Sequence, residues 1–240
     1  MSVDIFYGHN PLSGNRLSYQ IQTGLRFLGS ILILFVMLFG GAAHAEEDVP
    51  SPAARYIQER VKARQDDRQF TCQGELICGI ALIPEFYAAR DFEPAWSTPQ
   101  GPTSQALALL GEIRRVGDEG LSPEDYHFGR LQTMTTQLVS AGPDATPAAL
   151  GRRADFDLLM TDAVFLLGAH LLGGRVNPET IHASWDAFSH EVDLVRLLND
   201  GLQGGRMAHL IQGLHPPYTG YTGLRRALID YRRMAAAGGW

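Results

Sequence analysis

Residues 155–174, DFDLLMTDAVFLLGAHLLGG, decide the fold of this chain. From residue 158 to 172 nearly every position is apolar on all sides of a helix, a pattern typical of a membrane span or of a helix at the centre of a domain. Fifteen residues that include an aspartate and a histidine are too few to span a bilayer. The stretch therefore predicts a central, buried helix in which Asp162, Leu166 and His170 have structural roles.

The sequence around this helix is also helical in pattern. Apolar stripes at helical spacing, bounded by capping residues, glycine and proline, predict amphipathic helices. These helices are expected at 104–116, 122–139, 192–202, 206–214 and 221–237. A β-tolerant apolar run suggests an extended segment near 76–83. We expect a mainly α fold, with a single domain of about six to eight helices.

The first 45 residues form an export signal rather than part of the fold. Ile31–Phe39 is an unbroken apolar run, and a small-x-small site ending at Ala45 predicts cleavage before Glu46. Uncut, Phe27–Ala43 gives 17 mostly apolar residues, at the bottom of the range for a spanning helix. Residues 1–45 are therefore a signal peptide or an N-terminal membrane anchor. With either alternative we expect the rest of the protein to be exported.

Charge and length limit what the exported part can be. The first 45 residues hold two arginines and one aspartate, so the remaining 195 carry a net charge of −7. This acidity argues against nucleic acid as a partner, since nucleic acid needs a basic face. We divide the remaining chain into a polar lead-in helix at 46–71 and a helical domain at 72–240. Contact with a membrane is expected through an uncut N-terminal segment alone.

Two cysteines, Cys72 and Cys78, are the whole complement of the chain. In an oxidising compartment such a pair favours a disulfide. A helical step of six residues would separate them by about 9 Å, more than a bridge allows, so a bridge requires a turn, which Gly74 permits. The alternative is two buried thiols.

Three acids offer candidate chemistry. Asp155 and Asp162 lie near the same face of a helix, and paired carboxylates can perform acid–base catalysis. In the alternative interpretation Asp155 and Asp157 lie in the first turn, where negative charge is favoured. Asp162 is then a buried acid bonded to an arginine or a loop amide. The second interpretation is the one we favour.

Other candidate sites are weaker. His182, Asp186 and His190 are spaced at i, i+4 and i+8, which on a helix could present a metal site, although they are more simply exposed polar residues. Tyr218 and Tyr221 could stack on sugars or belong to the core. We expect no cofactor, no metal and no catalytic residue.

Four ordered blocks resemble a known family. They are FYAARDFEPAW at 86–96, GDEGLSPEDYH at 117–127, DLLMTDAVFLLGAHLLGGRVNPETIHASW at 157–185 and YTGLRRALIDYRRMAAAGGW at 221–240. Together they resemble the N-terminal scaffold domain of large periplasmic L,D-transpeptidases, the murein-crosslinking enzymes of Gram-negative bacteria. In that family a peptidoglycan-binding module and a catalytic domain follow the scaffold.

The chain departs from this family where chemistry is concerned. The family's catalytic cysteine lies in a Ser-x-Gly-Cys-x-Arg motif after a His-Gly segment, and the sequence contains neither. The resemblance therefore implies a non-catalytic scaffold in peptidoglycan crosslinking, either free-standing or the product of a truncated or split gene. Its expected partner is a catalytic L,D-transpeptidase module, another cell-wall protein or peptidoglycan itself. The alternative is an exported hydrolase or metal-binding protein that uses Asp162 or the set of His182, Asp186 and His190.

Overall fold

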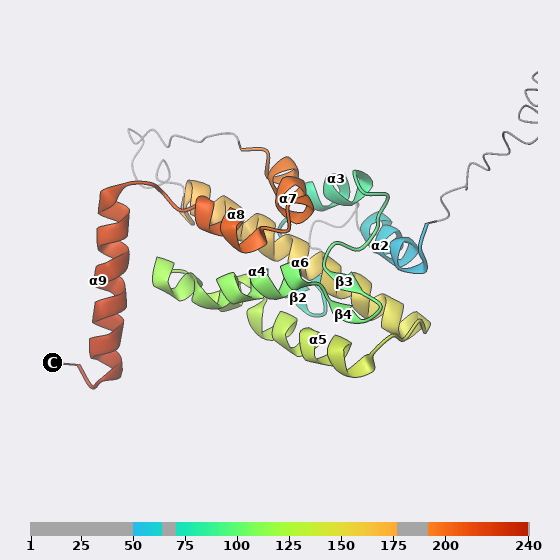
Figure 1. Ribbon diagram of the computed structural model, residues 1–240, viewed down its shortest axis with the longest axis horizontal. Helices are drawn as coiled ribbons and strands as arrows, with labels where there is room; N and C mark the ends of the chain where they lie inside the picture. Colours follow the sequence, from blue (N-terminus) through green and yellow to red (C-terminus); the bar gives the residue numbers. More distant parts are fainter. Residues whose placement is uncertain (1–49, 64–70, 177–191, 240) are drawn as a thin grey trace, which may run out of the picture. The chain divides into compact units, whose positions relative to one another are not determined.

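A computed structural model describes residues 50–63, 71–176 and 192–239. From Pro50 onward the chain forms one compact unit, built mainly of α-helices (Figure 1). The α-helices in these ranges are α2 (Pro52–Lys62), α3 (Leu82–Ala88), α4 (Ser104–Arg115), α5 (Phe128–Ala141), α6 (Pro147–Gly173), α7 (Leu194–Gln203), α8 (Met207–Gly213) and α9 (Thr219–Ala236). The prediction of a mainly α fold with six to eight helices is confirmed.

Helix α6 is the centre of the domain. It packs against α2, α3, α5 and α7, and Figure 1 shows it running among them. It begins at Pro147, with Thr146 as its N-cap, and is therefore longer than the apolar stretch alone predicts. Among the described residues α6 is the one helix long and apolar enough to cross a membrane, yet 72% of its most apolar window is buried in the domain. Its burial agrees with the predicted central helix.

Helix α2 lies within the predicted polar lead-in and belongs to the core. Ile57 and Val61 are buried, and the helix packs on α6. Ser51 caps it by accepting a hydrogen bond from the amide of Ala54. Helix α2 is therefore part of the domain, because its buried residues Ala54, Ile57 and Val61 recur at helical spacing on one face.

The predicted extended segment at 76–83 is largely replaced by other structure. The strands in the described ranges are two antiparallel pairs of two residues each: β1 (Thr71–Cys72) with β2 (Glu75–Leu76), and β3 (Ser97–Thr98) with β4 (Gly101–Pro102). Helix α3 already begins at Leu82. The expected extended region is thus reduced to β2 and the turn before α3.

The predicted disulfide is not formed. Cys72 is buried, and its thiol lies 3.6 Å from the carbonyl oxygen of Asp155, whereas Cys78 is exposed. The expected turn is present, with Gly74 at a φ of 85°. The turn closes the β1–β2 pair, which leaves Cys72 facing the core and Cys78 two residues beyond β2.

The predicted helix at 122–139 is interrupted at one residue. A 3-10 helix, η2 (Pro123–Tyr126), and α5 are separated by His127, which has a φ of 60°. Left-handed backbone is unfavourable for a residue with a side chain, so its neighbours must hold it there. The contacts of the His127 ring supply the reason.

Candidate functional site

The acids of α6 lie in the interior of the helix. Because α6 begins at Pro147, Asp155 and Asp157 are not in its first turn, which contains no acid; the first-turn interpretation is therefore wrong. Asp155, Asp157 and Asp162 are all buried. Each accepts hydrogen bonds from a different segment of the chain, so the helix acts as a row of attachment points.

Asp155 attaches the N-terminal part of the domain. Its Oδ1 accepts a hydrogen bond from Arg60 Nε at 2.8 Å, and its Oδ2 accepts one from Gln73 Nε2 at 2.7 Å. The same carboxylate therefore holds α2 and the β1–β2 turn against α6.

Asp157 attaches the segment that leads into β3. Its Oδ1 accepts the amides of Ala95 and Trp96 at 2.6 and 3.0 Å, and its Oδ2 accepts the Ser97 hydroxyl at 2.5 Å. Burial raises the pKa of Asp157 to about 6, although these hydrogen bonds act in the opposite direction. One turn further along, Thr161 Oγ1 accepts the indole N–H of Trp96 at 2.9 Å.

Asp162 joins two more segments. Its Oδ1 accepts the amides of Cys78 and Gly79 at 2.8 and 2.5 Å, and its Oδ2 lies 2.8 Å from Nε2 of His127. The other ring nitrogen of His127 lies 3.2 Å from Oε2 of Glu75. Asp162 is thus a buried acid bound by loop amides, as the favoured interpretation expects. The two carboxylates explain why the backbone of His127 is held in an unfavourable conformation.

This geometry supports structure rather than catalysis. Asp162 is 0% exposed and His127 is 5% exposed, so no substrate reaches either group in this conformation. Both oxygens of Asp162 are already engaged. A general acid or base needs a substrate atom within hydrogen-bond reach, directly or through one water. The hydrolase alternative at Asp162 is not supported by this arrangement.

The other residues singled out from the sequence are dispersed. Leu166 is partly buried and packs against the core, and His170 Nδ1 lies 2.9 Å from the Tyr126 hydroxyl. His182, Asp186 and His190 lie outside the described residues, as do Ala45 and Glu46. Within the part of the chain that the structure describes, no group of three His, Cys, Asp or Glu side chains could hold a metal ion.

The contact of His127 with Asp162 and Glu75 makes the stability of the domain depend on pH. Burial is the largest effect on the pKa of His127 and lowers it, but the hydrogen bonds and charges of Asp162 and Glu75 together outweigh burial, and the net pKa is raised. A raised folded pKa stabilises the fold fully below the unfolded pKa of about 6.5, and this contribution disappears as the pH rises through the folded pKa. We therefore expect the free energy of unfolding to fall as the pH rises above about 6.5.

Urea unfolding of the wild type and of His127→Gln across pH 5.5 to 8.5 measures this dependence. The variant has no ionisable group at this position, so its unfolding free energy should change less over the interval. Parallel curves for the two proteins would show that His127 does not titrate with folding.

A second set of contacts attaches the C-terminal helix α9. Glu119 ends the 3-10 helix η1 (Val116–Glu119), and its side chain is 4% exposed. It accepts hydrogen bonds from the Tyr221 hydroxyl and from Arg225 Nε, and lies 3.4 Å from His215 Nε2. Burial and the adjacent Glu119 raise the pKa of Tyr221. The Tyr221 hydroxyl is therefore bound to Glu119 within the domain, whereas Tyr218 is 70% exposed.

Helix α9 spans 18 residues, and none of them is buried. Two of its faces are exposed. Leu224, Tyr231 and Met234 are 75%, 56% and 40% exposed. They recur at i, i+7 and i+10, so they form one stripe, which we call the α9 apolar stripe. Arg226 and Arg233 each follow a stripe residue by two positions, about 200° around the helix, and lie on the opposite side.

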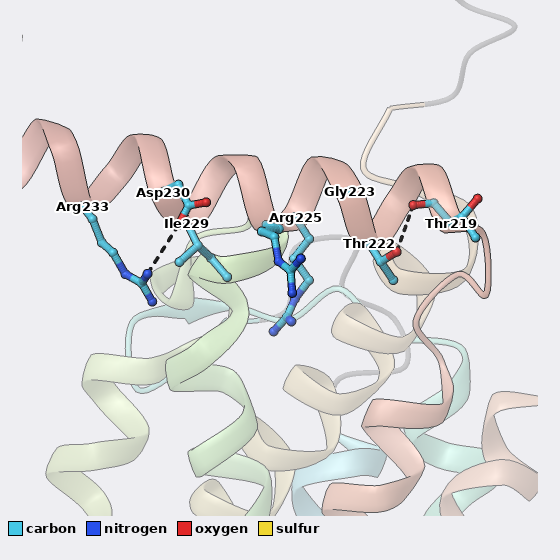
Figure 2. A pocket seen from close by; sticks show the side chains of 8 residues that line it. Thr219, Thr222, Gly223, Arg225, Ile229, Asp230 and Arg233 are labelled. Carbon is cyan, nitrogen blue, oxygen red and sulfur yellow. Dashed lines mark hydrogen bonds and ion pairs between the residues drawn. The ribbon is translucent and has the colours of Figure 1, made fainter.

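The side of α9 that carries the arginines borders a shallow pocket of about 510 Å³. Figure 2 shows Arg225, Ile229 and Arg233 pointing to this side of the helix, with Arg233 joined to Asp230. Four arginines and one aspartate make α9 basic in a chain whose net charge is −6. The sequence pattern pointed to Tyr218 and Tyr221 here and missed both the stripe and the arginine side.

Comparison with models of known protein families identifies the family of this chain. The family model described as Scaffold domain matches residues 81–228, from the residue before α3 into α9. The chain belongs to the Scaffold domain family. No curated protein and no solved structure matches it. The match is consistent with the resemblance to L,D-transpeptidase scaffolds, and it covers the attachment row on α6 and the first half of the scaffold's last helix.

Proposed function

We propose that this scaffold domain is an exported, non-catalytic component of peptidoglycan crosslinking or remodelling, which docks a catalytic L,D-transpeptidase module through α9. It would act in the periplasm, either free or anchored to the inner membrane by its N-terminal segment. The family match supports a scaffold role. The cell-wall context rests on the four sequence blocks and on the export signal.

The α9 apolar stripe carries this proposal. Exposed large apolar side chains on one face of a helix are typical of an interface, since a soluble surface rarely gathers them without a partner. The helix is firmly attached to the domain at one end of the stripe through Glu119, Tyr221 and Arg225, so the stripe is presented in a fixed orientation. Arg226 and Arg233, on the opposite side, would remain in water.

Two features support a non-catalytic role. The sequence lacks the Ser-x-Gly-Cys-x-Arg motif of the catalytic domain. Asp157 and Asp162 are buried and accept backbone amides, and buried Asp155 is bound by the side chains of Arg60 and Gln73, so these acids are unsuited to bind a substrate. The purified chain should therefore not crosslink a murein tetrapeptide donor, and observed crosslinking would contradict this part of the proposal.

The docking experiment measures binding of the detergent-solubilised full chain to a purified catalytic L,D-transpeptidase domain by calorimetry. Leu224→Glu places a charge in the stripe and should weaken binding at least about tenfold, because burying an unpaired carboxylate costs more than 1.4 kcal/mol. Ala236→Glu adds the same charge to an exposed position of the same helix outside the stripe and should leave binding unchanged.

The alternative partner, murein, is tested with purified sacculi. Equal binding by wild type and Leu224→Glu to the catalytic domain would overturn docking through the stripe. Retention on sacculi that is lost on changing Tyr218 to alanine, with no binding of the catalytic domain, would replace the docked module with the wall itself as the partner.

A further inference from the structure

The α9 apolar stripe has the spacing of a coiled-coil contact. Leu224, Tyr231 and Met234 are placed at i, i+7 and i+10, and Ala227 fills position i+3 between them. Steps of three and four residues are the a/d pattern at which two helices pack side by side along their length. We call these four residues the α9 seam. Because α9 spans 18 residues, about 27 Å, the seam is long enough to receive a second helix.

The contacts that hold α9 to the domain leave this seam open. Tyr221 and Arg225 bind Glu119, and Arg232 binds the backbone of η1. At about 100° per residue, the three side chains from α9 lie about 100–140° around the helix from the centre of the seam. Leu224 accordingly keeps 75% of its surface exposed. A second helix can therefore pack along the seam while α9 stays attached.

The seam is complementary to itself when two copies of α9 run antiparallel. In that arrangement an a position of one helix faces a d position of the other. Leu224 then faces Met234 of the second copy. Ala227 faces Tyr231 of the second copy, so the bulkiest side chain meets the smallest and the two helices interdigitate. Parallel helices would set Ala227 against Ala227 and Tyr231 against Tyr231, which leaves a gap next to a crowded contact.

The charges of α9 do not oppose this pairing. Arg226 and Arg233 lie about 120–140° around the helix from the centre of the seam, so they point away from the second helix. Asp230 borders the seam, and its charge is paired with Arg233 of its own helix at 3.4 Å. Arg225 is paired with Glu119. The two basic helices can therefore approach each other along their apolar sides.

We propose that α9 pairs with α9 of a second copy of this chain, through an antiparallel helix–helix contact along the α9 seam. A closed two-fold dimer is the commonest arrangement of identical chains, and its interface is self-complementary. One pair of short helices makes a small interface, so the dimer is weak and reversible. The second copy and the catalytic module would cover the same stripe and exclude each other. This exclusion rests on the proposed function, whereas the pairing does not.

Sedimentation equilibrium of the full chain in density-matched detergent measures the pairing. The protein is studied from about 5 to 500 µM, because a small interface is weak. Wild type should show a monomer–dimer equilibrium, and Leu224→Glu should associate at least about tenfold more weakly, because it buries carboxylates in the seam. Ala236→Glu, at an exposed position outside the seam, should associate as the wild type does. Wild type that stays monomeric, or equal association by Leu224→Glu, would overturn the proposal.

A pair of complementary changes tests the antiparallel arrangement. Met234→Lys alone should also weaken association. The double variant with Leu224→Glu and Met234→Lys places each new carboxylate opposite a new ammonium group of the other copy. It should associate at least about tenfold more tightly than Leu224→Glu, as expected of close charge pairs at an interface. Parallel helices would place the new charges opposite their own kind, so an absence of rescue would overturn the antiparallel pairing.

The same double variant separates self-association from docking. It should pair with itself but not bind the catalytic domain, because the two changes match only each other. Unchanged helical circular dichroism shows that each variant is folded. Self-association of a wild type that fails to bind the catalytic domain would support the pairing and remove the docking proposal. A wild type that docks but never self-associates would do the reverse.

Discussion

Replacing Asp162 with alanine is expected to lower the free energy of unfolding by about 3–5 kcal/mol, the cost typical of removing one partner from a buried ion pair. The change leaves the amides of Cys78 and Gly79 without their acceptor and the ring of His127 without its carboxylate. The approach to α3 and the η2–α5 junction both meet α6 at this side chain. Urea unfolding followed by circular dichroism at pH 6 measures the loss.

Two further variants define this effect. Asp200 is an exposed aspartate of α7, and Asp200→Ala should change stability by no more than about 0.5 kcal/mol. Asp162→Asn keeps an oxygen for the two amides but gives up the charge opposite His127, so its loss should lie between the other two. If Asp162→Ala is no less stable than Asp200→Ala, then the hydrogen bonds at Asp162 do not hold the fold together.

The fold could be predicted from the sequence because its signals are local. A helix over residues 158–172 is apolar on all sides and can be buried only inside a domain. The amphipathic helices at 104–116 and 192–202 need to bury only one face. The longer reach of α6 back to Pro147 was missed because its first turns carry arginines and small residues with no clear stripe. Burial of those turns comes from α2 and the β3–β4 hairpin, whose positions depend on tertiary contacts.

The attachment row was only partly predictable. A buried Asp162 bonded to loop amides follows from placing an acid inside an apolar helix. The donors to Asp162 could not be predicted, because the amides of Cys78 and Gly79 carry no sequence signature. His127 was missed for a related reason: the capping pattern before it suggests a continuous helix, and its left-handed backbone is imposed by two carboxylates distant in sequence.

The surface of α9 shows a different limit of sequence patterns. Leu224, Tyr231 and Met234 have the spacing of a core face, and nothing in their pattern distinguishes a stripe that meets its own domain from one that meets a partner. The structure makes that distinction through exposure, with Leu224 75% exposed. A contact that lies in another molecule is necessarily absent from the pattern of one chain.

Removing the carboxylate of Asp157 is expected to have the second largest effect on stability, because it accepts three hydrogen bonds from the segment that leads into β3. Asp157→Ala should cost about 2–4 kcal/mol at pH 7, because the amides of Ala95 and Trp96 and the Ser97 hydroxyl lose a buried acceptor. The loss is reduced by the removal of a carboxylate that is itself unfavourable when charged, as its raised pKa of about 6 shows. Thermal or urea unfolding at pH 7 measures the change.

Asp157→Asn separates these two contributions. The amide oxygen can still accept from Ala95 and Trp96, its NH2 group can donate to the Ser97 hydroxyl, and no charge is buried. Because the folded pKa of Asp157 lies above its unfolded value of about 3.9, the wild type should lose stability as the pH rises from about 4 through 6, and Asp157→Asn should lose less. At pH 7 the asparagine variant should therefore lie within about 1 kcal/mol of the wild type, well above the alanine variant. Equal losses for asparagine and alanine would mean that the charge of Asp157, rather than its hydrogen-bond geometry, holds the segment at β3.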